Sequence, residues 1–149
     1  AVPEKEMFNG IDAFQKGAAA GNDIEIIQPD QLHIAPAKDV VLVNAIKAVL
    51  QDDSNMIVDK MVAADMILFV SPVYWWGITA QLKLVIDKAY CKGTLLKNKS
   101  RRDHCRRISS RKQQYDLIRG QFNCISNYLG WDILFHKDYY ASAKDDLLK

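Results

Sequence analysis

Residues 65–83 read Asp-Met-Ile-Leu-Phe-Val-Ser-Pro-Val-Tyr-Trp-Trp-Gly-Ile-Thr-Ala-Gln-Leu-Lys. An apolar run from Met66 to Val70 stops at Ser71-Pro72, and three aromatic residues and a glycine follow before a helical pattern opens at Thr79. A run that is apolar on both faces is typical of a parallel strand covered by helices on each side. In such sheets ligands bind just beyond the carboxyl ends of the strands. We therefore expect a ligand at the loop that follows Val70.

The composition of this loop suits a planar, partly polar ring system. Tyr74, Trp75 and Trp76 offer flat apolar surface with polar edges, and Gly77 permits a close approach of the backbone. Pro72 fixes one backbone dihedral, so the chain leaves the strand in a defined direction. The alternative is an ordinary strand–loop–helix connection with core aromatics. Three consecutive aromatic residues cannot all point inward, however, so at least one should face solvent, a partner or a ligand.

Helical and strand patterns alternate along the chain. Apolar residues recur every three or four positions in several segments that also begin or end with capping residues, which predicts helices, and short apolar runs predict strands. The pattern from 38 to 50 fits either a helix or a strand. We expect one α/β domain over residues 1–149 with a mostly parallel sheet. The expected helices are 13–20 before Gly21, one from about Asn55 preceded by capping Asp52-Asp53, one capped by Thr79, and 115–129 before Gly130; the expected strands are 24–27, 66–70 and 131–136.

Bulk properties narrow the class of protein. The chain has 149 residues, of which 49% are apolar, and a net charge of +2. No apolar segment is long enough to span a bilayer, and Glu4, Lys5 and Glu6 interrupt any signal-peptide pattern. We expect a cytoplasmic protein that is not associated with a membrane.

Cysteine and histidine spacing does not indicate a metal or disulfide site. Three cysteines at wide spacings favour reduced thiols, with Cys124 in a helix. His33, His104 and His136 are too scattered for a metal site, and His136 should face outward on the last strand. We expect no metal.

The loop and the helix after it resemble a known family. Ser-Pro-Val-Tyr-Trp-Trp-Gly-Ile-Thr-Ala-Gln-Leu-Lys, followed by Val-Ile-Asp-Lys at 85–88, resembles the second flavin loop and helix of flavodoxin-like NAD(P)H-dependent FMN reductases and quinone reductases. That group includes flavoproteins named Trp-repressor-binding proteins. Supporting matches occur at 52–53, 64–65, 115–118 and 127–131. The resemblance implies a flavodoxin-like doubly wound parallel sheet of order 2-1-3-4-5 with helices on both faces.

The resemblance also implies a function. FMN would lie over the strand ends and take hydride from NAD(P)H, and electrons would pass to flavin, quinone or a similar small-molecule acceptor. No catalytic acid or base is required of the chain. Family members are commonly homodimers or homotetramers. A flavin-binding electron-transfer or regulatory module without NAD(P)H turnover is the alternative. The residues that would line the isoalloxazine ring are Ser71, Pro72, Val73, Tyr74, Trp75 and Gly77.

A basic segment interrupts an otherwise acidic chain. Residues 99–112 hold seven basic residues and one acid. Clustered Lys and Arg can contact nucleic-acid phosphates, but no recognition motif accompanies them here. The sequence therefore disfavours nucleic acid as a partner.

Two pieces of the family pattern are missing. The family opens with a hydrophobic strand and a phosphate-binding loop, where this chain reads Ala-Val-Pro-Glu-Lys-Glu. It also expects a strand and a Gly-rich loop after residue 99, where this chain reads Ser-Arg-Arg-Asp-His-Cys-Arg-Arg. These would be strands one and four, which flank strand three in the flavodoxin order. Without them we expect the remaining strands to be unable to pair.

A displaced reading frame would account for the missing pieces. Reverse-translated and read one base along, residues 99–111 allow Lys-Val-Ala-Gly-Ile-Ile-Val-Gly-Glu-Ser-Ala-Val-Gly, a buried strand ending in a glycine loop. Residues 1–9 read one base along and residues 38–45 read two bases along also allow family-like segments. The alternative is a diverged or inaccurately recorded chain. If the backbone is family-like, residues 103–107 should form a central strand although their side chains are poorly suited to one.

Overall fold

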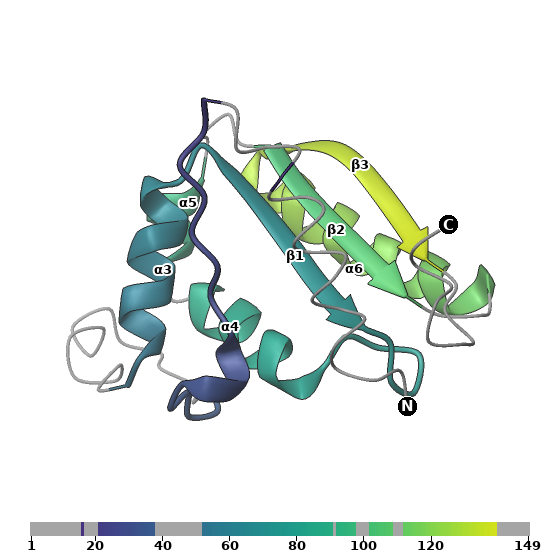
Figure 1. Ribbon diagram of the computed structural model, residues 1–149, viewed down its shortest axis with the longest axis horizontal. Coiled ribbons are helices and arrows are strands. Elements are labelled where there is room, and N and C mark those ends of the chain that lie inside the picture. Colours follow the sequence, from purple (N-terminus) through teal and green to yellow (C-terminus); the bar gives the residue numbers. More distant parts are fainter. Residues whose placement is uncertain are drawn as a thin grey trace.

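The computed structural model describes residues 16, 21–37, 52–90, 92–97, 102–108 and 112–139. These residues form three strands with helices packed against them (Figure 1). No helix in these ranges is long and apolar enough to cross a membrane. In chain order the elements are η1 (Pro29–Gln31), α3 (Ser54–Ala63), β1 (Met66–Pro72), α4 (Ala80–Tyr90), α5 (Gly93–Leu96), β2 (Arg102–Ile108), α6 (Lys112–Leu129) and β3 (Asp132–Tyr139).

The three strands form one parallel sheet of order β1-β2-β3. The middle strand, β2, comes from the basic segment, so the expectation of a central strand at 103–107 is confirmed. The expectation that strands at 66–70 and 131–136 could not pair for want of a strand between them is wrong. The backbone ladder on both sides of β2 overrides the poor strand propensity of its sequence, because strand preference depends mainly on context.

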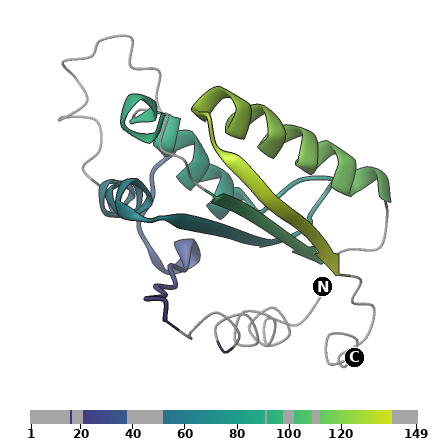
Figure 2. The same cartoon turned by 90° about the horizontal axis from the view of Figure 1, so that it is seen from above.

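The described core lies between the sheet and helices on one of its sides. Figure 2 shows α6 lying along that face. Phe69 of β1 meets Phe122 of α6 with ring centroids 5.2 Å apart. Leu82 and Val85 of α4 belong to the same buried cluster. The presence of helices on both faces of the sheet, which the resemblance implies, stays a prediction.

Most of the expected elements that fall in the described ranges are confirmed. Helices α3, α4 and α6 match the expected helices, and Gly21 and Gly130 adopt positive φ of 87° and 70°, as expected of turn and cap residues. The expected strand at 24–27 is wrong, since the chain there forms no strand. A strand needs a neighbouring strand to pair with, and none of the three described strands pairs with this segment. The expected helix 13–20, apart from helical Lys16, and the segment 38–50 lie outside the described residues.

The prediction that His136 faces outward is also wrong. The register between β2 and β3 shifts at Asp103 and His104, so that Ile133 and Phe135 oppose consecutive residues of β2. A bulge of this kind adds one residue and reverses the alternation of faces beyond it. His136 is consequently half-buried, with its Nε2 3.2 Å from Asn123 Oδ1 on α6.

Candidate functional site

The base of the aromatic loop is closed by the hydroxyl group of Ser71. This side chain is 2% exposed, and its Oγ accepts a hydrogen bond from the Thr79 N–H at 3.0 Å and donates to the Pro72 carbonyl at 2.8 Å. Thr79 Oγ1 in turn accepts from the Leu82 N–H at 3.3 Å, which confirms it as the cap of α4. The two ends of the loop are therefore held together where β1 ends and α4 begins.

The tip of the loop is a tight turn closed by a pair of backbone hydrogen bonds. The Tyr74 N–H donates to the Gly77 carbonyl at 3.0 Å, and the Gly77 N–H donates to the Tyr74 carbonyl at 2.9 Å. Trp75 and Trp76 between them have φ of 48° and 62°. Two consecutive left-handed residues define a type I′ turn, which favours Asn-Gly. Each bulky residue in this conformation costs about 1–2 kcal/mol.

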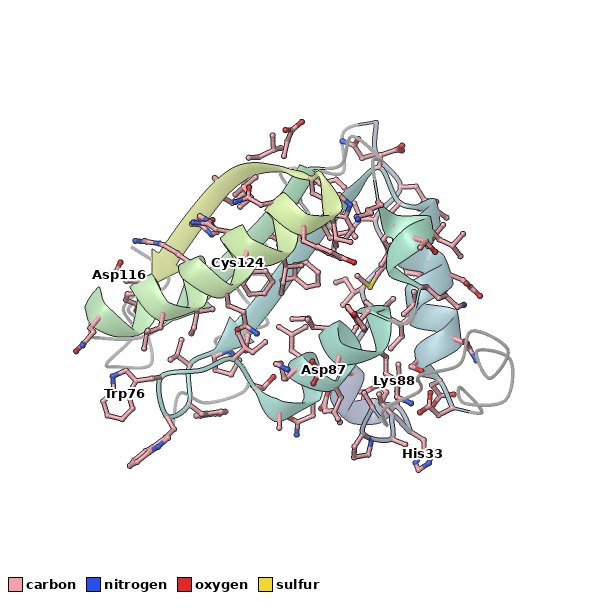
Figure 3. The ribbon with its side chains drawn as sticks, turned by 180° about the vertical axis from the view of Figure 1, so that it is seen from behind. His33, Trp76, Asp87, Lys88, Asp116 and Cys124 are labelled. Carbon is pink, nitrogen blue, oxygen red and sulfur yellow. The ribbon has the colours of Figure 1, made fainter. Side chains whose placement is uncertain are left out.

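The aromatic side chains of the turn face outward. Trp75 is 91% exposed, Tyr74 55% and Trp76 39%. Figure 3 shows Trp76 at the loop, directed away from the helices. The two indole rings meet edge to face, with centroids 5.3 Å apart and an interplanar angle of 85°. The expectation that at least one of the three aromatics faces outward is confirmed, and Trp76, which was not among the predicted flavin contacts, belongs to this surface.

The six predicted flavin contacts separate into an inner and an outer group. The side chain of Ser71 is buried, and that of Val73 packs against the core cluster. Ser71 can therefore offer only backbone atoms to a ligand, whereas Val73 is half-buried. Tyr74 and Trp75 lie on the exposed side of the turn, while Pro72 and Gly77 are half-buried between the groups.

The backbone of the turn fits a flat ligand with acceptor atoms along its edge. The N–H groups of Trp75 and Trp76 donate to no acceptor within the described part of the chain. A Cβ added to Gly77 would meet only the Tyr74 carbonyl oxygen, at 3.7 Å, so the packing of the loop itself does not require glycine. Free donors beside an open glycine match the carbonyl and nitrogen edge of an isoalloxazine ring. The phosphate half of such a site would involve residues 1–9, which lie outside the described ranges.

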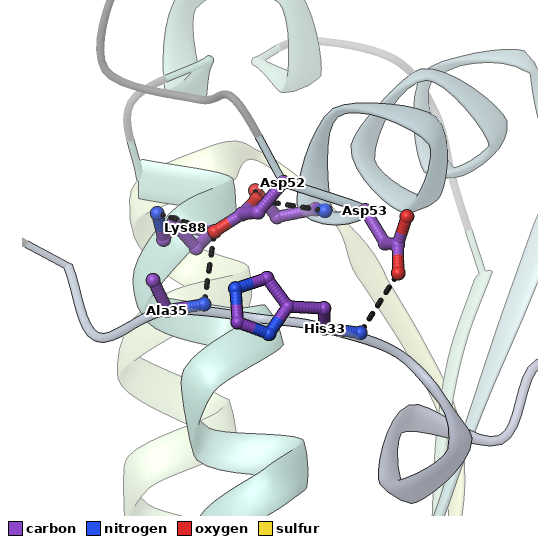
Figure 4. A network of polar contacts seen from close by, with 6 residues as sticks. His33, Ala35, Asp52, Asp53 and Lys88 are labelled. Carbon is purple, nitrogen blue, oxygen red and sulfur yellow. Dashed lines mark hydrogen bonds and ion pairs between the residues drawn. The ribbon is translucent and has the colours of Figure 1, made fainter.

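Asp52 and Lys88 form a buried ion pair that sequence reasoning did not identify (Figure 4). The Lys88 Nζ lies 3.0 Å from Asp52 Oδ2, and the two side chains are 2% and 5% exposed. The Ala35 N–H donates to the same oxygen at 2.9 Å, and Ser54 donates its N–H and hydroxyl to Oδ1. Lys88 lies three residues after Val85 on the apolar face of α4, and this position could have indicated from the sequence that its charge is buried and paired.

Asp53 caps α3 less directly than predicted. It occupies the N-cap position without a side-chain cap, and its Oδ2 accepts instead from the His33 N–H at 2.8 Å. The cap oxygen for the first turn comes from Asp52, through the 3.0 Å bond from the Ser54 N–H. The acidic pair therefore connects α3 to the segment around His33.

Comparison with known proteins identifies the family. The family model described as NADPH-dependent FMN reductase matches residues 10–101, a range that includes the whole aromatic loop. The chain belongs to the NADPH-dependent FMN reductase family. This match ends one residue before β2 begins.

A curated relative of this chain is YwqN of Bacillus subtilis (strain 168), whose name describes a putative NAD(P)H-dependent FMN-containing oxidoreductase. The two sequences are 30% identical over 77 residues, which is 52% of this chain and 42% of YwqN. The matched region thus spans less than half of the relative.

Two solved structures share the fold. The Trp repressor binding protein from Bacillus subtilis has a TM-score of 0.52 and 19% identity, and the match covers 64% of this chain and 67% of that one. A thermophilic tryptophan halogenase (Th-Hal) from Streptomycin violaceusniger has a TM-score of 0.61 and 17% identity, with 99% and 85% coverage. At these identities the likeness concerns the fold alone.

Proposed function

We propose that the protein is an FMN-dependent NAD(P)H oxidoreductase that reduces flavin, quinone or a similar small acceptor. The observation that carries this proposal is the aromatic turn at the carboxyl end of β1, inside the region that matches the FMN reductase family. When bound, FMN supplies the redox chemistry by accepting a hydride from NAD(P)H and passing two electrons to the acceptor. Reduction of the acceptor thus takes up the equivalent of one hydride, which comes from NAD(P)H, and one proton, which comes from solvent.

The chain's own contribution is to bind and orient the ring. Ser71 closes the base of the loop, so the backbone of the turn is held in place before a ligand arrives. The Trp75 and Trp76 N–H groups would donate to the ring edge, and Gly77 would allow the ring to approach. Preorganised donors of this kind avoid an ordering cost when the ligand binds.

Several finer features extend the proposal. β1, β2 and β3 would be strands three, four and five of a flavodoxin sheet of order 2-1-3-4-5, within one domain over residues 1–149. A homodimer or homotetramer in the cytoplasm would be the working form. Nucleic acid is disfavoured as a partner, because no recognition motif accompanies the basic segment.

The spectrum of the purified protein with added FMN tests this function. We expect a yellow complex, quenched tryptophan emission, and anaerobic bleaching of the flavin band by NADH or NADPH. Flavin binding without bleaching would favour the alternative, an electron-transfer or regulatory module without NAD(P)H turnover. A protein that takes up no FMN would contradict both functions.

A further inference from the structure

Helix α4 begins directly after the aromatic loop, and Thr79 takes part in both. The Thr79 N–H donates to Ser71 Oγ at 3.0 Å, which closes the loop, and Thr79 Oγ1 caps the helix at the Leu82 N–H. A tilt of about 5° around its far end moves the near end of a helix about 16 Å long by about 1.4 Å. Such a shift breaks a hydrogen bond, so the loop stays closed only while α4 keeps its direction.

A buried charged contact fixes the far end of α4. Besides apolar side chains, the helix buries Lys88 in its last turn. The Lys88 Nζ lies 3.0 Å from Asp52 Oδ2, and the two side chains are 2% and 5% exposed. Figure 3 shows Lys88 on the far side of Asp87 from Trp76 of the loop. Apolar burial is non-directional, whereas a charged hydrogen bond restricts the helix end to one placement.

The partner of Lys88 is itself held in place. Asp52 Oδ2 also accepts the Ala35 N–H at 2.9 Å, and Oδ1 accepts the N–H of Ser54 at the start of α3 at 3.0 Å. Figure 4 shows these contacts converging on one carboxylate. The end of α4 is therefore attached to α3 and to the segment around Ala35 together.

We propose that Lys88 is a positioning residue of the flavin site. Its ion pair with Asp52 fixes the direction of α4, keeps the Thr79 N–H in place against Ser71, and so holds the donor turn ready for FMN. This inference rests on the proposed function and gives a buried pair at the far end of the helix a role in cofactor affinity. Both side chains are buried, so the effect is exerted through α4.

The test compares the wild type with Lys88→Met, Lys88→Arg and Lys92→Met. Met resembles Lys in length but lacks its charge, and Arg restores the charge. Lys92, just beyond α4, pairs with Asp59 of α3 at 2.6 Å, and the Asp59 side chain is 66% exposed. Lys92 therefore links the end of α4 to α3 through a solvated contact and is the matched control. If Lys88→Met does not fold, Lys88→Gln, which offers the carboxylate an amide donor, replaces it with the same expected direction.

Amide hydrogen exchange of the FMN-free protein, measured by NMR, reports on the closure of the loop. In Lys88→Met we expect the exchange rate of the Thr79 N–H, relative to that of the Phe122 N–H on α6, to rise about tenfold. A general loss of stability would not raise this ratio, because it accelerates exchange in α6 at least as much. Lys88→Arg should return the ratio to within about threefold of the wild type, and Lys92→Met should leave it unchanged.

The dissociation constant of FMN should also rise about tenfold in Lys88→Met, because the donor turn must then be ordered when the ligand binds. It should change less than about threefold in Lys88→Arg and Lys92→Met. A pair that only stabilised the fold would not alter this constant. While unfolding is rare, the affinity of the folded molecules does not depend on the unfolding equilibrium.

Three results would overturn the proposal. Unchanged Thr79 exchange and FMN affinity in a destabilised Lys88→Met would reduce the pair to a stabilising contact. An equal loss of FMN affinity in Lys92→Met would show that the buried pair has no particular role, and a Lys88→Arg as weak as Lys88→Met would show that the charge is not responsible. Failure of the proposed function is recognised separately, because the wild type would then take up no FMN while Thr79 exchange still responded to Lys88→Met.

Discussion

Asp52 joins three separate segments of the chain through one carboxylate. Oδ2 receives the Lys88 ammonium and the Ala35 N–H, and Oδ1 receives both donors of Ser54. Burial raises the pKa of Asp52, but the hydrogen bonds from Ser54 and Ala35 and the Lys88 charge outweigh it and hold the pKa well below its usual range. These hydrogen bonds and the ion pair therefore favour the ionised form of the carboxyl in the folded protein.

Replacing Asp52 with Asn should lower the free energy of unfolding at pH 7 by about 3 kcal/mol, because it leaves the buried Lys88 charge without its partner. The effect should depend on pH. A carboxyl with a lowered folded pKa stabilises the protein above its unfolded pKa, near pH 4, and loses this contribution as pH falls further. The unfolding free energies of wild type and variant in urea should thus differ fully at pH 5–7, and the difference should narrow progressively as the pH falls below about 4.

The matched control for Asp52 is Asp87→Asn. Asp87 pairs with Lys83 at 2.5 Å on the exposed side of α4, with both side chains more than a third exposed. Exposed pairs at this spacing contribute about 0.3–0.5 kcal/mol. An equal decrease in the free energy of unfolding in the two variants would show that the buried ion pair stabilises the protein no more than the exposed one.

Gly77→Ala tests whether a ligand approaches the turn. The residue lies outside the left-handed region and an added Cβ has room beside Tyr74, so the free energy of unfolding should change by less than about 0.5 kcal/mol. We expect the dissociation constant of FMN to rise at least tenfold, measured by flavin fluorescence, since the methyl group would occupy the approach. Gly120→Ala, at an open position on α6, should leave FMN affinity unchanged. Full FMN affinity in Gly77→Ala would place the ring elsewhere.

Among the elements, β2 shows the largest conflict between sequence and structure. Five of its seven residues are Arg, Asp or His, yet it pairs with β1 on one side and β3 on the other. Positions 103, 105 and 107 are in register with Ile67, Phe69 and Ser71 of β1, where Phe69 packs on α6. Charged groups are costly at such positions unless they are paired. The frame-displaced sequence would place Ile and Val at positions 103 and 105, although it keeps a charged residue, Glu, at position 107.

Replacing residues 99–111 with Lys-Val-Ala-Gly-Ile-Ile-Val-Gly-Glu-Ser-Ala-Val-Gly should therefore stabilise the protein. We expect the free energy of unfolding in urea to rise by more than about 2 kcal/mol, because apolar residues then occupy the central strand. A control with Gln at 102, 106 and 107 removes positive charge without supplying apolar side chains, and it should gain much less. A chimaera no more stable than the wild type would contradict the frame hypothesis.

At the scale of the whole molecule, the extent of the family match and the pairing of the sheet both bear on the hypothesis of a displaced reading frame. The match covers 10–101 and stops where β2 begins, although the backbone continues as a strand that pairs with β1 and β3. A displaced reading frame predicts a break of this kind, in which a strand keeps its place in the sheet while its sequence departs from the family pattern.

Tandem mass spectrometry of the protein from its natural host decides whether residues 99–111 have the given sequence or the frame-displaced one. Peptides spanning residues 99–111 should read Val-Ala-Gly-Ile-Ile-Val-Gly if the frame hypothesis is correct, whereas peptides that match the printed residues would sink it. The peptides from α6 serve as an internal control, because both hypotheses give the same sequence there.

The sequence alone was sufficient for the elements whose signals are local. The apolar run before Ser71, the three-and-four spacing of α6 and the cap at Thr79 each depend on neighbours in the chain, and the loop motif between β1 and α4 identified the family. Tertiary structure alone decided the pairing of β2, the bulge that turns His136 toward α6, the Asp52–Lys88 pair, and the left-handed turn that exposes Trp75. The first three features depend on residues brought together from distant parts of the chain, where backbone pairing and burial outweigh local preference. The turn is local, but its conformation opposes the preference of its two tryptophans.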